Sequence, residues 1–232
     1  MHIQHVYAVY FSPTGNTRRI VCQGASEAAR LFQVPCRAIS LNLPKDREMV
    51  HTFSAGDLVI VGGPTYAGKL PNKILPTYQE KLIGKGALAL AVVTYGNRSF
   101  DNSLAELCAT LDGNGFRTVA AGAFVGTHAF SDVLAPDRPD KDDLALMVRL
   151  TDMAVSKIRQ TDGMVPRLVV DGDARAPYYV PKGVDGQPAK FLKAKPKTDL
   201  EKCVSCGLCA RQCPMGSIDP DQPSVVNGIC IK

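Results

Sequence analysis

Short apolar runs alternate with amphipathic stretches from residue 5 to about residue 160. Five runs are apolar or β-branched and end at turn residues, as buried strands do; they cover residues 5–11, 36–43, 57–62, 87–95 and 117–125. Four stretches repeat apolar residues at helical spacing; they cover residues 17–32, 71–82, 100–111 and 141–159. Because strands that alternate with helices form right-handed βαβ units, the pattern predicts an α/β fold with a doubly wound, five-stranded parallel sheet.

The loop after the first predicted strand has three hydroxyls and a glycine at the head of a helix. Its residues of interest are Ser12, Thr14, Gly15, Asn16 and Thr17. Ligands of such sheets bind beyond the carboxyl ends of the strands, and free N–H groups at a helix N-terminus attract phosphate. The loop lacks the sequence signatures of an ATP or NAD site. It predicts a phosphate site, with plain helix capping by Ser12 or Thr14 as the alternative.

Two further loops combine a tyrosine with glycines and polar groups. The third strand is followed by Pro64, Thr65, Tyr66, Ala67 and Gly68, and the fourth by Thr94, Tyr95, Gly96, Asn97 and Arg98. Each could be a turn that exposes a tyrosine, but both are expected at the same sheet edge as the phosphate loop. Together the three loops predict an FMN site, in which one loop holds the phosphate and the other two enclose the planar ring.

The loop after the fifth strand contains His128 and Arg138 and opens on the same edge. Either side chain could reach the flavin or a substrate. We favour the simpler interpretation, a loop leading into the next helix in which Arg138 pairs with Asp140 or Asp142.

Near the C-terminus the chain has four closely spaced cysteines followed by a proline. Cys203, Cys206, Cys209 and Cys213 follow the C-x2-C-x2-C-x3-C-P pattern that holds a cubane iron–sulfur cluster in bacterial ferredoxins. A zinc site or a disulfide framework is the alternative, but zinc sites usually pair two C-x2-C clips across a longer gap. The run therefore predicts a 4Fe-4S cluster.

Cys230 lies where a second run of this kind would begin, two residues before the last residue given. In two-cluster ferredoxins the fourth cysteine of one run ligates the other cluster. We expect that the sequence is truncated inside its second motif. The alternative is a single cluster with Cys213 or Cys230 as its fourth ligand.

Composition describes an ordinary globular protein of 232 residues, with 45% hydrophobic and 21% charged residues. No signal peptide or bilayer-spanning apolar stretch is apparent, so we expect a cytoplasmic protein with no membrane partner. The net charge of +5 is mild and basic residues are not grouped with aromatics, which gives no support for nucleic-acid binding. Cys22, Cys36 and Cys108 stand singly in apolar patterns and are expected to be buried.

These features divide the chain into three parts. Residues 1–160 would form the sheet domain and residues 199–232 the iron–sulfur segment. Residues 161–198 lack sustained periodicity and contain Tyr178 and Tyr179. We expect this part to be an irregular connector whose aromatics pack on the first domain.

The motifs resemble those of a known family. Ser12-x-Thr14-Gly15-x-Thr17 is similar to the phosphate loop of flavodoxins, and the two tyrosine loops are similar to their isoalloxazine loops. With the cysteine run, the chain resembles the flavodoxin–ferredoxin fusion proteins, which implies a flavodoxin-like fold with a small ferredoxin-like segment. The resemblance covers the first 160 residues and the cluster segment. Two departures are the absence of tryptophan, so that Tyr66 or Tyr95 must stack on the ring, and the basic charge.

The resemblance and the residues together predict an electron-transfer flavoprotein that couples FMN to 4Fe-4S chemistry, with no acid–base residue required. Its partners would be redox proteins, either ferredoxin-type carriers or a reductase. One alternative is an FMN-dependent reductase of a quinone, flavin or other small oxidised substrate. The other is a flavodoxin-like module with a structural zinc clip.

Overall fold

The computed structural model describes residues 2–188 and 195–231. Its main body is a five-stranded parallel sheet with the order β2-β1-β4-β6-β7, covered by helices on both faces. The strands are β1 (His5–Tyr10), β2 (Cys36–Ser40), β4 (Asp57–Pro64), β6 (Leu88–Tyr95) and β7 (Arg117–Val125). The covering helices are α1 (Asn16–Phe32), α2 (Leu75–Lys81), α3 (Ser103–Gly113) and α4 (Lys141–Gln160). The predicted fold is confirmed, with strand ends within three residues of those expected.

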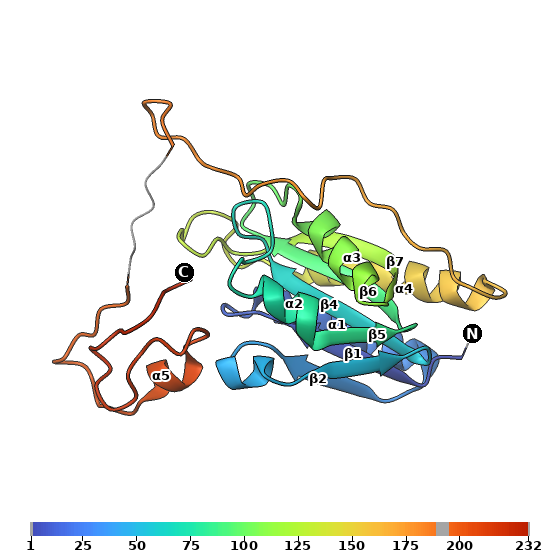
Figure 1. Ribbon diagram of the computed structural model, residues 1–232, viewed down its shortest axis with the longest axis horizontal. Coiled ribbons are helices and arrows are strands. Elements are labelled where there is room, and N and C mark those ends of the chain that lie inside the picture. The colour runs from blue at the N-terminus through green and yellow to red at the C-terminus, as the bar shows by residue number, and fades with distance from the viewer. Residues whose placement is uncertain (1, 189–194, 232) are drawn as a thin grey trace.

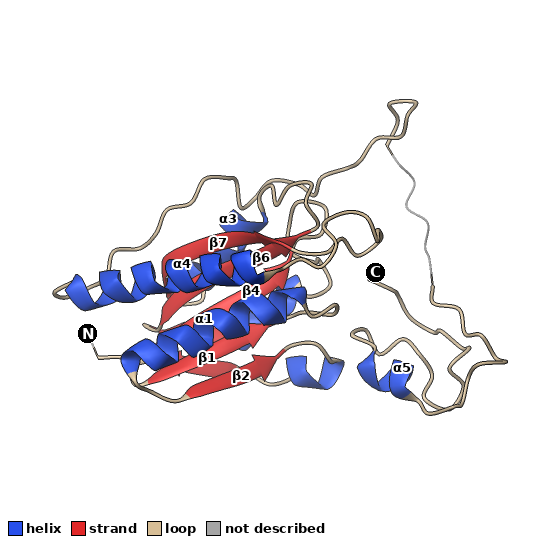
Figure 2. Cartoon of the chain, turned by 180° about the vertical axis from the view of Figure 1, so that it is seen from behind, coloured by secondary structure: helices blue, strands red, loops and turns tan. Residues whose placement is uncertain are grey.

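Both faces of the sheet are buried. In β4, Leu58 and Ile60 pack with α1 and α4, whereas Val59 and Val61 pack with α2 and α3. Figures 1 and 2 show these two helix layers in front of and behind the sheet. The continuous apolar run of β4 therefore follows from its central position, because alternate side chains enter different cores.

Helix α1 approaches β4 closely at Gly62. A Cβ built at this glycine would overlap Cγ2 of Val21 and lie 2.9 Å from Cγ2 of Thr17. The missing side chain lets the first turns of α1 lie directly on the sheet.

A second, two-stranded parallel sheet escaped the sequence analysis. It consists of β3 (His51–Ser54) and β5 (Leu82–Lys85). The amphipathic pattern predicted a helix over residues 71–82, whereas α2 begins later, at Leu75. It ends at Lys81, where the side-chain amide of Asn114 donates to the carbonyls of Tyr78 and Leu82 at 2.7 and 2.8 Å. A distant residue thus ends the helix, and four-residue strands give little periodic signal.

Beyond α4, the chain runs back over the main body to its opposite end and continues into the cysteine segment (Figure 1). That segment contains the short helix α5 (Leu208–Gln212) and lies beside the 3₁₀ helix η1 (Pro44–Arg47). Arg47 donates a 2.7 Å hydrogen bond to the carbonyl of Pro214. None of the described helices has both the length and the apolar character needed to cross a membrane.

The three isolated cysteines differ in exposure. Cys108 is buried and Cys22 is half-buried, but Cys36 is exposed. The expectation was wrong for Cys36 because it begins β2, the strand at the edge of the sheet, where one side has no neighbouring strand.

We expect Gly62→Ala to destabilise the fold by about 1–3 kcal/mol, because the added methyl overpacks the α1–β4 contact. Urea denaturation measures the change. Gly113→Ala is the matched control, since a Cβ there meets nothing within 4 Å and alanine favours the helix. Equal stability of the Gly62 variant and the parent would contradict the close packing.

Candidate functional site

The loops after β1, β4, β6 and β7 surround one cavity of about 420 Å³ at the carboxyl edge of the sheet. Most of the residues expected to bind a flavin line this cavity. They are Thr14, Asn16, Thr17, Pro64, Thr65, Tyr66, Ala67, Thr94, Tyr95 and Gly96. Ser12, Gly15, Gly68, Asn97 and Arg98 are not among its lining residues.

Ser12 bonds to the first turn of helix α1 and is not among the residues that line the cavity. It is buried, and its hydroxyl accepts a 3.0 Å hydrogen bond from the backbone N–H of Arg18 in the first turn. Its own N–H donates to Oδ1 of Asn42 at 2.6 Å. The N-cap residue is Gly15, so neither Ser12 nor Thr14 takes that position; the exposed Thr14 lies on the cavity wall.

The start of α1 fits an anion. Gly15 is the N-cap residue with φ of 90°, and a Cβ built on it would meet nothing within 4 Å. Open space at this position lets a ligand approach the backbone, and the positive end of the 17-residue helix favours negative charge. Thr17 is held by a 2.7 Å hydrogen bond between its hydroxyl and that of Thr94, which joins this loop to the end of β6.

The loop after β4 forms a tight turn that presents Tyr66. The N–H and C=O groups of Tyr66 pair with those of Lys69 at 2.8 and 3.2 Å, and Ala67 and Gly68 between them have φ of 48° and 81°. Both central residues are left-handed, as in a type I′ turn. Gly68 faces away from the cavity, because its Cβ would lie 2.5 Å from Oδ2 of Asp101.

Tyr66 is the main aromatic group on this side of the cavity. Burial, with a smaller contribution from Cys230, raises the pKa of Tyr66 to about 12. The phenol is therefore protonated at neutral pH and can donate a hydrogen bond.

The loop after β6 turns its polar residues outward. Tyr95 lines the cavity and packs against Phe100, with 5.5 Å between ring centroids. Arg98 instead forms an ion pair with Asp101 and lies over the ring of Tyr179, 4.1 Å from its centroid. Arg98 thus holds the loop from outside, and Asn97 is exposed with φ of 64°.

The loop after β7 contributes residues that the sequence analysis did not assign to the site: Gly126, Thr127, His128, Ala129 and Phe130. The side-chain amide of Asn16 donates to the carbonyl of Thr127 at 3.2 Å, which ties this loop to the start of α1. The sequence could have indicated this contribution, because the carboxyl ends of all strands in a parallel sheet lie at the same edge. The cavity wall therefore includes His128, and the same loop leads into α4 as expected.

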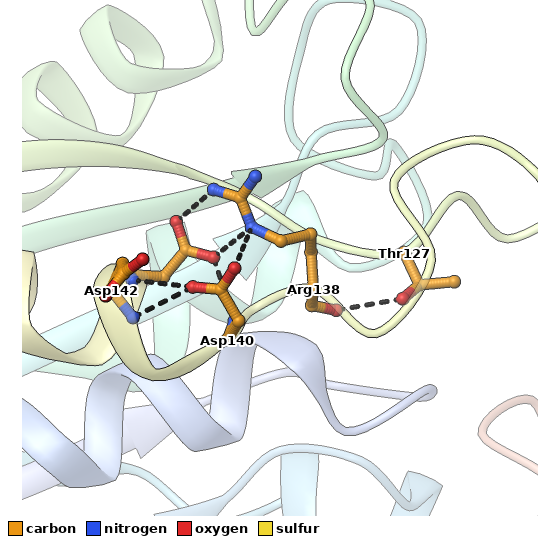
Figure 3. Close-up of polar contacts among 5 residues, drawn as sticks. Thr127, Arg138, Asp140 and Asp142 are labelled. Atoms are coloured by element: carbon orange, nitrogen blue, oxygen red, sulfur yellow. Dashed lines mark hydrogen bonds and ion pairs between the residues drawn. The ribbon is translucent and has the colours of Figure 1, made fainter.

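Arg138 fixes the far end of this loop. Its carbonyl accepts hydrogen bonds of 2.9 Å from both the N–H and the hydroxyl of Thr127, and its guanidinium pairs with Asp143 and lies 3.4 Å from Asp140 (Figure 3). Pairing with Asp140 is confirmed. In the described structure Arg138 pairs with the buried Asp143 and not with Asp142, whose backbone N–H donates to Oδ1 of Asp140 at 2.9 Å.

A second cavity, of about 590 Å³, adjoins the first. Cys209, Cys213 and Cys230 line it, together with apolar residues of the C-terminal segment. Six residues line both cavities, namely Pro13, Thr14, Tyr66, Ala129, Cys230 and Ile231.

The cysteine run lies beside this second cavity without forming a closed ligand set. Cys206 and Cys209 are exposed, Cys203 and Cys213 are half-buried, and none of these four described residues forms a disulfide. The sulfur of Cys213 accepts a hydrogen bond of 3.3 Å from the N–H of Ser217. Within the described ranges, no three His, Cys, Asp or Glu residues are grouped closely enough to hold a metal ion. The donors nevertheless fit iron–sulfur chemistry, since they are thiols at ferredoxin spacing.

Residues 196–219 match a protein family described as the 4Fe-4S binding domain. This match covers the whole cysteine run, and the sheet order is that of the flavodoxin-like fold. The chain joins a flavodoxin-like domain to a ferredoxin-type segment. In the ferredoxin-type segment, Ser205 and Gly207 take positive φ values of 52° and 66°, so that the backbone turns sharply between Cys203 and Cys209.

Solved structures similar to the flavodoxin-like domain include flavodoxins and an oxidoreductase. An archaeal flavodoxin is 14% identical with a TM-score of 0.45, and the match covers 68% of this chain and all of that one. A flavodoxin of Streptococcus pneumonia TIGR4 is 17% identical (TM-score 0.47; 66% and 99% covered), and the apo form of the NADH:FMN oxidoreductase EMOB is 16% identical (TM-score 0.48; 70% and 94% covered). No curated protein matches the chain. Because these TM-scores are low, the fold assignment depends on the strand order of the five-stranded sheet and not on the similar structures.

The Arg138–Asp143 pair predicts a pH-dependent stability. Hydrogen bonding from Arg138 lowers the pKa of Asp143, so the pair stabilises the fold above pH about 4, and this contribution is lost as the pH falls through the lowered pKa. We expect Arg138→Met to cost about 1.5–3 kcal/mol at pH 7 and clearly less at pH 3. Urea denaturation at both pH values tests this, with the exposed Arg149→Met as control. A loss that is the same at both pH values would contradict it.

Proposed function

We propose that the protein transfers electrons between an FMN in the first cavity and a 4Fe-4S cluster held by the ferredoxin-type segment. FMN exchanges one or two electrons and a cluster exchanges one, so the pair can link two-electron donors to one-electron carriers. The observation that carries this proposal is the wall common to the two cavities, which contains Tyr66 and Cys230. This wall supports the proposal because the cavity expected to hold the flavin adjoins one that three of the cysteines line.

The residues of the first cavity divide into two groups under this proposal. The phosphate would lie at the start of α1, against the amides of residues 14–17 and the hydroxyl of Thr14. The ring would lie between the loops that carry Tyr66 and Tyr95. Gly96 leaves room for His128, since a Cβ on Gly96 would overlap the imidazole.

The cluster would be held by Cys203, Cys206 and Cys209, with Cys213 or Cys230 as the fourth ligand. The N–H of Ser217 that already points to the sulfur of Cys213 is the kind of hydrogen bond that tunes a cluster potential. Ferredoxin-type carriers or a reductase would exchange electrons with the protein.

A second function, reduction of a small oxidised substrate by FMN, is favoured by the loop after β7. His128 and Phe130 line the cavity, and Phe130 is 73% exposed. His128 Nδ1 accepts the N–H of Phe130 at 3.1 Å, so a neutral imidazole carries its proton on Nε2 and can donate there. Saturable turnover with a quinone or free flavin would favour this function over that of a carrier.

FMN binding is tested with Thr14→Ala, which removes an exposed hydroxyl from the phosphate loop. We expect the Kd for FMN, measured by quenching of flavin fluorescence, to rise about tenfold, as loss of one hydrogen bond to a charged group predicts. Riboflavin has no phosphate, so its affinity should stay the same. Thr52→Ala removes an exposed hydroxyl from β3 and serves as control. An unchanged Kd for FMN would refute the phosphate assignment.

Cluster binding is tested with Cys206→Ala after anaerobic reconstitution with iron and sulfide. We expect the iron content and the broad visible absorption to fall by at least half, because a cubane cluster needs its thiolates. Cys36→Ala removes an exposed cysteine outside the run and should leave both unchanged. Zinc in place of iron after anaerobic purification would support the structural zinc clip.

A further inference from the structure

Residues 172–179, which we call the strap, belong to the connector and cross the outside of both tyrosine loops. No strap residue lines either cavity. Their contacts nevertheless go to the backbone and side chains of the two loops that would enclose the flavin ring. The strap therefore contacts the site from outside.

Three hydrogen bonds join the strap to the loop after β4. The hydroxyl of Tyr178 donates to the carbonyl of Leu70 at 2.6 Å, and the N–H of Tyr179 donates to the carbonyl of Ala67 at 2.7 Å. The ammonium of Lys69 donates to the carbonyl of Ala174 at 2.6 Å. These bonds hold the central residue Ala67 and the C-terminal end of the turn that begins at Tyr66.

A buried ion pair adds to this fastening. Lys69 and Glu106 are 3% and 7% exposed, and their charged atoms lie 3.0 Å apart. The other carboxylate oxygen of Glu106 accepts the N–H of Leu70 at 2.7 Å. A buried charge is tolerated only when it is paired and hydrogen-bonded, so the carbonyl of Ala174 completes a set of partners that Lys69 requires.

The strap also contacts the loop after β6. The N–H of Asp173 donates to Oδ1 of Asn102 at 2.8 Å, and the N–H of Asn102 donates to the carbonyl of Gly68 at 2.9 Å. The ring of Tyr179 lies beneath the guanidinium of Arg98. The strap thus connects the two tyrosine loops to each other.

We propose that the strap sets the separation of the two loops that bind the flavin ring, with Tyr178 and Lys69 as positioning residues. This inference rests on the proposed FMN site. Burial, with a smaller contribution from Glu106, raises the pKa of Tyr178 to about 12, so its hydroxyl remains a donor across the range in which the protein would work. Through this bond the connector determines the affinity and the potential of a cofactor that it does not contact.

The test compares Tyr178→Phe with Tyr179→Phe. The first substitution removes the hydrogen bond to Leu70; the second removes a hydroxyl that bonds to nothing in the described part of the chain and keeps both the ring and the N–H. In FMN-free protein we expect amide exchange in residues 66–70 to quicken about three- to tenfold in Tyr178→Phe, as loss of one hydrogen bond predicts. The Kd for FMN should rise by a similar factor and the midpoint potential of bound FMN should shift. Tyr179→Phe should match the parent in all three.

Each result decides a different point. Unchanged exchange in Tyr178→Phe, or faster exchange with the parent's FMN affinity and potential, would overturn the strap's role. Failure of the parent to bind FMN would instead refute the proposed function, whereas the exchange comparison in FMN-free protein would still show whether the strap holds the loops. Lys69→Met combined with Glu106→Gln removes the buried pair without leaving a lone charge and should reproduce the effects of Tyr178→Phe. The exposed Lys73→Met is its control.

Discussion

The contact of helix α1 with the sheet determines the position of the site. Gly62 lets Val21 and Thr17 lie against β4, and the hydroxyl of Thr17 reaches Thr94 at the end of β6. The helix N-terminus is thereby brought next to the loops of two neighbouring strands. A side chain at Gly62 would move α1 outward and separate the loop after β1 from the tyrosine loops, because a close-packed interior cannot absorb it without a shift.

Several polar residues at this edge hold the loops in place and do not face the cavity. Ser12 bonds to the first turn of α1, and Arg98 pairs with Asp101. The guanidinium of Arg138 pairs with Asp143, and its carbonyl accepts a hydrogen bond from Thr127. Loops with few apolar contacts need such bonds, since every buried N–H and C=O group must find a partner. A polar residue in such a loop can therefore either face the cavity or hold the loop in place. Only the three-dimensional structure shows which of these it does.

The sequence could predict the order and type of the main elements, because buried parallel strands and amphipathic helices have distinct periodicities. It could also predict that three loops meet, since parallel strands end at one edge. It could not predict that Gly68 turns toward Asp101 or that Asn114 ends α2, because these depend on residues more than thirty positions away. The rule that parallel strands end at one edge also covers the loop after β7, but the bond that ties this loop to Asn16, more than a hundred residues away in sequence, could not be predicted.

The connector changes how the two parts of the chain should be regarded. Residues 172–179 are bonded to the tyrosine loops, and Arg47 of the main body donates to the carbonyl of Pro214 in the cysteine segment. Under the proposed function, the flavin and the cluster would then meet across one preformed wall containing Tyr66 and Cys230. Electron transfer within the chain would need no diffusional encounter between its two parts. An acidic docking face for that step would be unnecessary, which is consistent with the net charge of +5.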